Sequence, residues 1–183
     1  MDCTSREWGF EALPNIRMKR GGAVRLEEVL ARRLAAEIES ELASLSALGE
    51  ELANAPQQDD IYSLRARGSI LHDFYNGVER VSVRIAPVLN GGIPRSDQWD
   101  RDLVDDMTLD ITEVRPAVID RGLARTLGEY LRFPHVFRNV YGGVLEAERM
   151  DSLEKRLPET LAAFRDRVET FVSWMLEPEV NGP

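Results

Sequence analysis

Arginines, a histidine and an asparagine recur in the second half of the chain at spacings that place them on one side of a helix. These positions are three, four or seven residues apart: Arg121, Arg125, Arg132, His135 and Asn139, with Arg138 beside them. Arginine binds phosphate through two parallel hydrogen bonds, and histidine gains or loses a proton near neutral pH. An ordinary solvated face would contain more glutamates. A lone His135 would more commonly be a solvated or capping residue, and its arginine neighbours favour a role in chemistry.

The other side of the same predicted helix, which extends from Asp120 to Gly142, is apolar. Its positions are Leu123, Leu127, Tyr130, Phe133, Phe137, Val140 and Tyr141, which should face the core. Pro134 interrupts the pattern, because proline removes a helical hydrogen bond at a cost of about 3 kcal/mol. Two interpretations stay open: a kink next to His135, or a new helix with Pro134 in its first turn.

Charge is unevenly distributed along the chain. The net charge is −9, which argues against a protein that coats nucleic acid with its whole surface. The segment 114–143 nevertheless contains five arginines, Arg115 among them, against Asp120 and Glu129. Such a segment forms either a local basic patch for a small anionic site or a set of ion pairs with acids on neighbouring helices.

Composition narrows the class of protein. Hydrophobic residues make up 43% and charged residues 30% of 183 residues, the balance of one globular domain. No apolar run approaches the roughly 20 residues needed to span a bilayer, and the first residues do not resemble a secretory signal. The single Cys3 and two histidines argue against a disulfide or a structural zinc site. We expect a cytoplasmic protein without a metal or other cofactor and without a membrane association.

The hydrophobic period predicts an all-α fold. Leucines and Ile38 recur every three or four residues from Leu26 to Leu52, which predicts a helix of about 30 residues over 24–54. A second stripe predicts a helix over 59–89, and the short connection makes the two an antiparallel hairpin. The turn 90–94 follows, and Trp99, Leu103 and Met107 mark a shorter helix.

The last predicted helix starts at Leu157-Pro158-Glu159, with proline in the first helical position. Its apolar stripe runs from Leu161 to Met175. Together these segments predict an up-and-down antiparallel bundle of about five helices, two long and three shorter, over 23–178. Residues 1–22 are expected to be a poorly ordered arm and 179–183 a frayed tail. His72 lies between core positions of the second helix, so we interpret it as structural.

Two segments resemble the HepT-like ribonuclease domains of the HEPN superfamily. The first is Gly68-Ser-Ile-Leu-His-Asp-Phe-Tyr-Asn-Gly-Val-Glu79, and the second is Tyr130-Leu-Arg-Phe-Pro-His-Val-Phe-Arg-Asn-Val-Tyr-Gly142. The resemblance extends over roughly residues 24–176. It implies an up-and-down helical bundle that forms homodimers, a metal-independent RNase activity, and a place as the toxin of a toxin–antitoxin pair. The antitoxin partner in such pairs is a nucleotidyltransferase that modifies a tyrosine of the toxin, which here is Tyr141.

The family's catalytic signature is an arginine, four to six residues, a histidine, and a tyrosine two places later. With Tyr141 aligned to that tyrosine, Asn139 takes the place of the histidine and Pro134 that of the arginine. Asparagine can hydrogen-bond a phosphate but cannot act as a general base. Arg132, His135 and Arg138 are the residues available to substitute, and Arg121 and Arg125 can bind RNA phosphates. The alternative is an inactive bundle that binds a nucleotidyltransferase or a nucleotide, and a purely structural helical oligomer is a third possibility.

Overall fold

The computed structural model describes residues 24–58, 60–89, 92–112, 114–137 and 144–177, and these residues form an all-α bundle. They contain five helices: α1 (Val24–Ala53), α2 (Ile61–Leu89), α3 (Trp99–Asp106), α4 (Arg121–Phe137) and α5 (Val144–Leu176). No strand occurs among them, and the extended pairing is limited to an isolated bridge between Ile111 and Arg115. The predicted fold class is confirmed. The arm 1–22 and the tail 179–183 lie outside the described residues, so those boundaries stay predictions.

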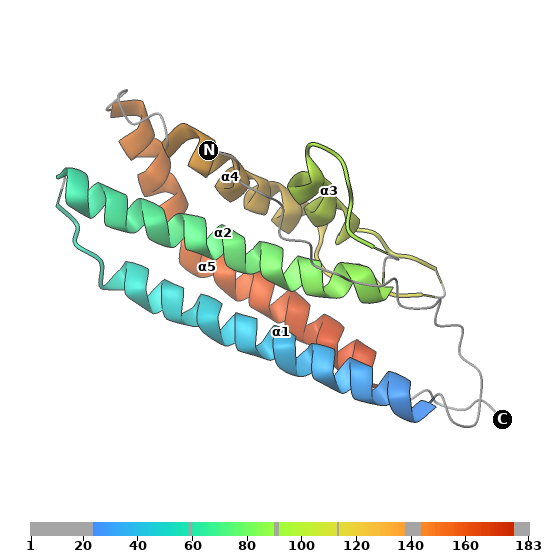
Figure 1. The fold of residues 1–183 in the computed structure, drawn as a ribbon. Coiled ribbons are helices and arrows are strands. Elements are labelled where there is room, and N and C mark those ends of the chain that lie inside the picture. Colours follow the sequence, from blue (N-terminus) through green and yellow to red (C-terminus); the bar gives the residue numbers. More distant parts are fainter. Residues whose placement is uncertain (1–23, 59, 90–91, 113, 138–143, 178–183) are drawn as a thin grey trace, which may run out of the picture.

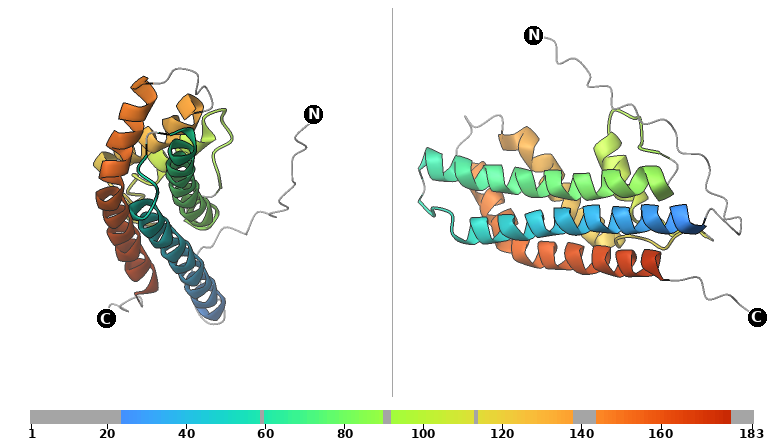
Figure 2. Two further views of the ribbon diagram at one scale, coloured as in Figure 1. Left: turned by 90° about the vertical axis from the view of Figure 1, so that its left-hand side faces the viewer. Right: turned by 60° about the horizontal axis from the view of Figure 1, so that its bottom comes forward.

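The helices α1 and α2 form the predicted antiparallel hairpin, and α5 runs beside it (Figures 1 and 2). Leu34, Ile38, Leu42, Leu45 and Leu52 of the α1 stripe are all buried. The two helices approach closely at Gly77, where a Cβ atom would lie 2.4 Å from Leu45 Cδ2. Burial of this continuous apolar stripe is what stabilises helices of this length.

Ion pairs join the exposed edges of α1 and α2. Arg84 lies 2.9 Å from Glu37 and 2.8 Å from Glu41, and Arg80 lies 2.8 Å from Glu41. The hydrogen bond from Arg33 is the main cause that lowers the pKa of Glu37. At Glu41 burial is the largest single effect and raises the pKa, but the contacts with Arg80 and Arg84 together outweigh it, so this pKa too lies below its usual value. Such partly exposed pairs contribute little stability individually.

The shorter helices cover the other side of α2. The helix α4 packs against α2 and α5, and α3 packs against α2 and α4. Phe74 of α2 meets Tyr130 of α4 edge to face, with ring centroids 5.0 Å apart. The turn between α2 and α3 contains Gly92 with a φ of 149°, a backbone conformation that favours glycine.

The start of the last helix differs from the prediction. The helix α5 begins at Val144 rather than near Leu157, has 33 residues, and contains Pro158 in its interior. It is therefore longer than α1 and α2, so the expectation of two long and three shorter helices is wrong. Figure 1 shows its first part inclined to the rest. Met150, Leu153 and Leu157 are buried before the proline, and their burial outweighs the hydrogen bond lost at Pro158.

The starts of α2 and α4 follow local capping by an aspartate. Asp60 accepts hydrogen bonds from the amides of Tyr62 and Ser63, so α2 begins at Ile61, two residues after the predicted start. Asp120 accepts a hydrogen bond from the amide of Leu123 at 2.8 Å, which makes it the N-cap of α4 and confirms the predicted start of this helix. None of the described helices is long and apolar enough to cross a membrane.

Candidate functional site: an arginine-lined groove between α3 and α4

The two predicted faces of α4 are present in the described part of that helix. Leu123, Leu127 and Tyr130 are buried, and the Tyr130 hydroxyl donates a hydrogen bond to the Leu153 carbonyl of α5 at 2.9 Å. Arg121, Arg125 and Arg132 are exposed on the other side. Their steps of four and seven residues bring them back to nearly the same angle around the helix. The arginine stripe is therefore a continuous feature of the α4 surface.

The acids next to this stripe are held by α5. Asp120 lies 3.1 Å from Arg167, and Glu129 pairs with Arg156. The backbone amide of Leu123 is the main cause that lowers the pKa of Asp120, and Arg156 is the main cause for Glu129. Within the described residues no ion pair reaches the stripe itself, Arg121, Arg125 and Arg132. For these three positions the interpretation as ion pairs with neighbouring helices is wrong, and the basic patch remains.

Arg115 does not belong to that patch. Its side chain is buried, and its guanidinium donates hydrogen bonds to the carbonyls of Asp106, Leu109 and Pro116 at 2.8–3.0 Å. Burial lowers the pKa of this arginine. It fastens the connection between α3 and α4 and is a structural residue, which sequence position alone did not distinguish from the exposed arginines.

A groove of about 570 Å³ lies between the arginine stripe and α3. Its apolar lining is Val104 of α3, Leu109 just after α3, and Ala124, Gly128 and Leu131 of α4. Nothing lies within 4 Å of the Cβ position of Gly128, so the helix backbone itself borders open space there. The α4 edge carries the three arginines, and the α3 edge carries Asp105 and Asp106 together with Arg101.

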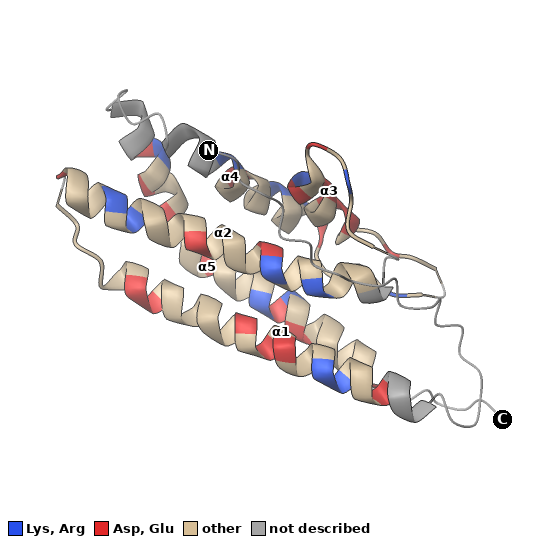
Figure 3. Cartoon of the chain, viewed as in Figure 1, with Lys and Arg blue, Asp and Glu red and all other residues tan. Residues whose placement is uncertain are grey.

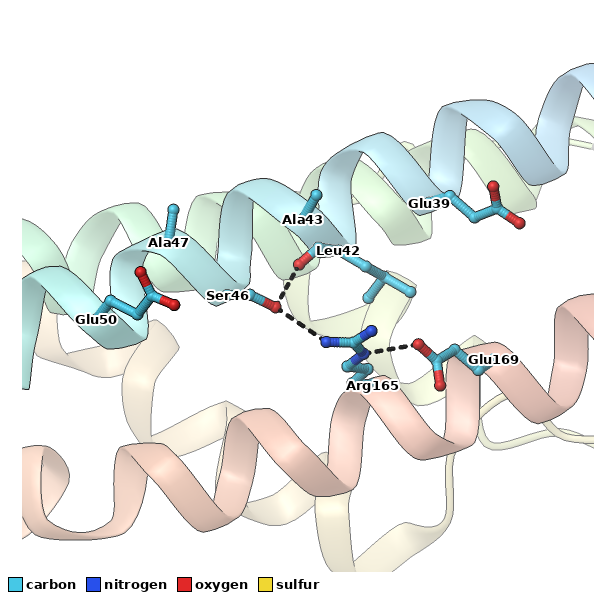
Figure 4. A pocket seen from close by; sticks show the side chains of 8 residues that line it. All are labelled: Glu39, Leu42, Ala43, Ser46, Ala47, Glu50, Arg165 and Glu169. Carbon is cyan, nitrogen blue, oxygen red and sulfur yellow. Dashed lines mark hydrogen bonds and ion pairs between the residues drawn. The ribbon is translucent and has the colours of Figure 1, made fainter.

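A second hollow lies between α1 and α5, and its charge is opposite (Figure 4). Three glutamates, Glu39, Glu50 and Glu169, line it together with Arg165. The Arg165 guanidinium is already engaged, 2.6 Å from Glu169 and 3.4 Å from the Ser46 hydroxyl. Figure 3 shows that acidic residues predominate along α1. This side of the molecule repels phosphate, whereas the α3–α4 groove attracts it.

The other predicted site residues are described only in part. The α4 backbone continues as a helix through Pro134 and His135 to Phe137, so the interpretation of Pro134 as the start of a new helix is wrong. The side chain of His135 lies outside the described part of the structure. The same holds for the whole of Arg138, Asn139 and Tyr141. Their roles remain predictions.

The sequence pattern did not find the α3 side of the groove. Arg101, Asp105 and Asp106 belong to an acid-rich helix whose residues look like an ordinary solvated face. Only the packing of α3 against α4 brings them to the arginine stripe. Gly128 could have been recognised, because it stands three residues after Arg125 and four before Arg132, on the same side of the helix.

A polar cluster on α2 lies outside this groove. The Tyr75 hydroxyl and His72 Nδ1 are buried and have no hydrogen-bond partner among the described residues. Burial raises the pKa of Tyr75, with further contributions from Asp100 and Glu79, and burial likewise raises the pKa of Glu79. His72 is half-buried between core residues, as its position in the sequence predicted.

The comparison with protein families decides the assignment. The model of the family described as HepT-like protein matches residues 66–175, more than half of the chain. The chain belongs to the HepT-like family. This family is part of the HEPN superfamily, so the resemblance inferred from the two segments of sequence is confirmed. No curated protein and no solved structure matches the chain significantly.

The match includes most of α2, all of α3 and α4, and nearly all of α5. It therefore contains both edges of the arginine-lined groove and the altered motif from Pro134 to Tyr141. Membership in the HepT-like family identifies the chain as a HEPN-type, toxin-like module.

Proposed function

We propose that this HepT-like chain is the toxin of a toxin–antitoxin pair and that it cleaves RNA without a metal ion, as a homodimer. One observation carries the proposal: the described face of α4 presents three arginines that form no ion pair, on the helix that continues into His135. Exposed arginines without carboxylate partners are suited to bind phosphate groups.

The chemistry requires two proton transfers. The 2′-hydroxyl oxygen attacks the adjacent phosphorus, the bond to the leaving 5′ oxygen breaks, and a 2′,3′-cyclic phosphate forms. A base accepts the proton of the 2′-hydroxyl, and an acid gives a proton to the leaving oxygen. Arg132 and Arg138 would stabilise the charge that develops on the phosphate, and Asn139 would hydrogen-bond it. His135 would transfer protons, since Asn139 cannot.

A homodimer would supply the second proton-transferring histidine that one copy lacks. A single histidine on α4 cannot be the acid and the base of the same step, whereas two copies related by a two-fold axis provide two histidines. We therefore place Arg132, His135 and Arg138 near the dimer axis. Tyr141 is the proposed site at which a nucleotidyltransferase antitoxin modifies and silences the toxin.

The second candidate is an inactive binding module for a nucleotidyltransferase or a nucleotide. The specific observation that favours it is the replacement of the motif arginine and histidine by Pro134 and Asn139. A module of this kind would keep the bundle and the arginine stripe but would not cleave.

Cleavage of a labelled single-stranded RNA by chelator-treated protein distinguishes the two candidates. We expect cleavage by the unaltered chain and a clear loss of rate in Arg132→Ala. The matched control is Arg32→Ala, which removes one exposed arginine from α1, a helix that contacts neither α3 nor α4. Binding of RNA without any cleavage would favour the inactive module. Equal rates for the two variants would show that Arg132 has no part in cleavage.

A further inference from the structure

We propose that the groove between α3 and α4 holds one nucleotide of a single-stranded RNA, with the base on the apolar lining and the flanking phosphates on the arginines. The inference rests on the proposed function and adds a substrate-binding subsite to it. The groove volume of about 570 Å³ lies in the range of roughly 300–1,000 Å³ that is typical of small-molecule sites.

The spacing of the arginines leaves a gap that suits a base. Arg125 and Arg132 are seven residues apart, which is about 10 Å along the helix axis. Gly128 lies between them and has no side chain to fill the groove. Two phosphates bound by the two arginines would therefore bracket a nucleotide whose base lies over Gly128.

The lining of the gap is apolar where a base would rest. Val104 and Ala124 form the buried floor of the groove, and the apolar surface open to a ligand comes from half-buried Leu131, exposed Leu109 and the backbone at Gly128. The flat face of a base loses its contact with water when it lies against such a surface, and this burial favours binding. A phosphate chain alone would gain no binding energy from contact with this apolar lining.

The charges orient the nucleotide across the groove. The arginine stripe is on the α4 edge, and Asp105 and Asp106 are on the α3 edge. Arg101 is the basic residue on that edge, and it lies 4.0 Å from Asp105. Carboxylates repel phosphate and accept hydrogen bonds from the amino groups of bases. The phosphate chain therefore follows α4, and the base turns toward α3.

Gly128→Leu tests the subsite because it fills the groove without disturbing the fold. The Cβ position is free of contacts, and leucine is a better helix former than glycine by about 1 kcal/mol. The matched control is Ala162→Leu, at an exposed position of α5. Arg125→Ala removes a phosphate contact, and Arg32→Ala on α1 is its control. Thermal unfolding of each variant verifies that the protein stays folded.

The measurement is the affinity for a short 2′-O-methyl oligoribonucleotide as a function of salt concentration. This probe lacks the attacking hydroxyl and is not cleaved. Each phosphate contact contributes about 0.7 to the slope of log affinity against log salt for a single strand. We expect Gly128→Leu to bind about tenfold more weakly, a change of ~1.4 kcal/mol, with an unchanged slope. Arg125→Ala should lower the slope by about 0.7, and both controls should behave as the unaltered chain.

Each other outcome is decisive as well. If Gly128→Leu binds normally while Arg125→Ala is impaired, the base subsite is wrong and RNA recognition by α4 stands. If Gly128→Leu also lowers the slope, the groove holds phosphate and the assignment of a base is overturned. If the unaltered chain does not bind the probe, the subsite and the proposed function both fail. If Gly128→Leu and Arg125→Ala change the affinity and the slope as expected but the unaltered chain does not cleave RNA, the subsite is supported and the proposed nuclease activity is rejected.

Discussion

Arg67 of α2 and Glu154 of α5 form an ion pair in the interior of the bundle, with 3.3 Å between Nε and Oε1 and side chains that are 4% and 11% exposed. Arg67 also donates a hydrogen bond to the Gln57 side chain at 3.1 Å. Glu154 stands four residues before Pro158, so its carbonyl lacks the usual helical donor. The pair therefore fastens α5 to α2 at the point where α5 is weakened.

Removal of one partner of this pair should be costly. Glu154→Ala leaves the Arg67 guanidinium buried without its carboxylate, and we expect a loss of about 3 kcal/mol in the free energy of unfolding. Urea denaturation measures this loss against Glu159→Ala, a control at an exposed position five residues further along α5. The double variant Arg67→Met with Glu154→Leu should recover most of the loss. A loss as small as that of the control would show that the pair does not stabilise the fold.

Glu79 should make stability depend on pH. Burial raises the pKa of its carboxyl above the ordinary value of 4.5, so the folded state favours the protonated form. Its contribution to stability is therefore complete below pH 4.5 and decreases as pH rises through the folded-state pKa. Glu79→Gln imitates the protonated form and should stabilise the protein at pH 7 but not at pH 4. Urea titrations at both pH values test this, and an equal effect at both would contradict it.

Two glycines should respond in opposite directions to alanine. At Gly77 a Cβ atom would lie 2.9 Å from Leu45 Cγ, and Leu45 is fully buried, so any shift of its side chain would disturb the surrounding core. We expect Gly77→Ala to cost about 1–3 kcal/mol through overpacking. Gly128→Ala enters open space and should stabilise α4 by about 1 kcal/mol. Melting temperatures of the two variants should move apart, and a common direction would refute the close approach at Gly77.

The elements that follow local rules were predictable from the sequence. The leucine period predicted the C-terminal end of α1 to within one residue. The helix predicted to extend from Asp120 begins there, because the Asp120 side chain caps α4. The start of α5 was not predictable, because Pro158 is a strong local signal for a helix start. Tertiary burial of Met150 and Leu153 overrides it.

The candidate site also has one part that was predictable from the sequence and one part that was not. The arginine stripe has a helical period, so it could be found in one segment of sequence. The opposite edge of the groove comes from α3, and only the packing of the two helices joins it to the stripe. Arg115 shows the converse: it shares the segment and the charge of the stripe, and its burial among backbone carbonyls makes it structural.

The proposed dimer can be tested by its molar mass. Light scattering on the eluting protein should give the mass of two chains at micromolar concentration. Arg132→Glu places a carboxylate near the proposed axis in each copy and should weaken the dimer, whereas Arg32→Glu on α1 should not. A monomeric unaltered chain would count against the dimer and against the two-histidine mechanism together.

The most direct test of the proposed nuclease is the rate of RNA cleavage when the proposed catalytic residue His135 and the two motif positions, Pro134 and Asn139, are exchanged. Loss of a general acid or base typically lowers a rate by about 10²–10⁴-fold, so His135→Ala should nearly abolish cleavage while the protein stays folded. Pro134→Arg together with Asn139→His restores the family pattern and should raise the rate. If His135→Ala loses nothing and the restored variant gains nothing, the catalytic site is not on α4, and the binding-module alternative replaces the nuclease.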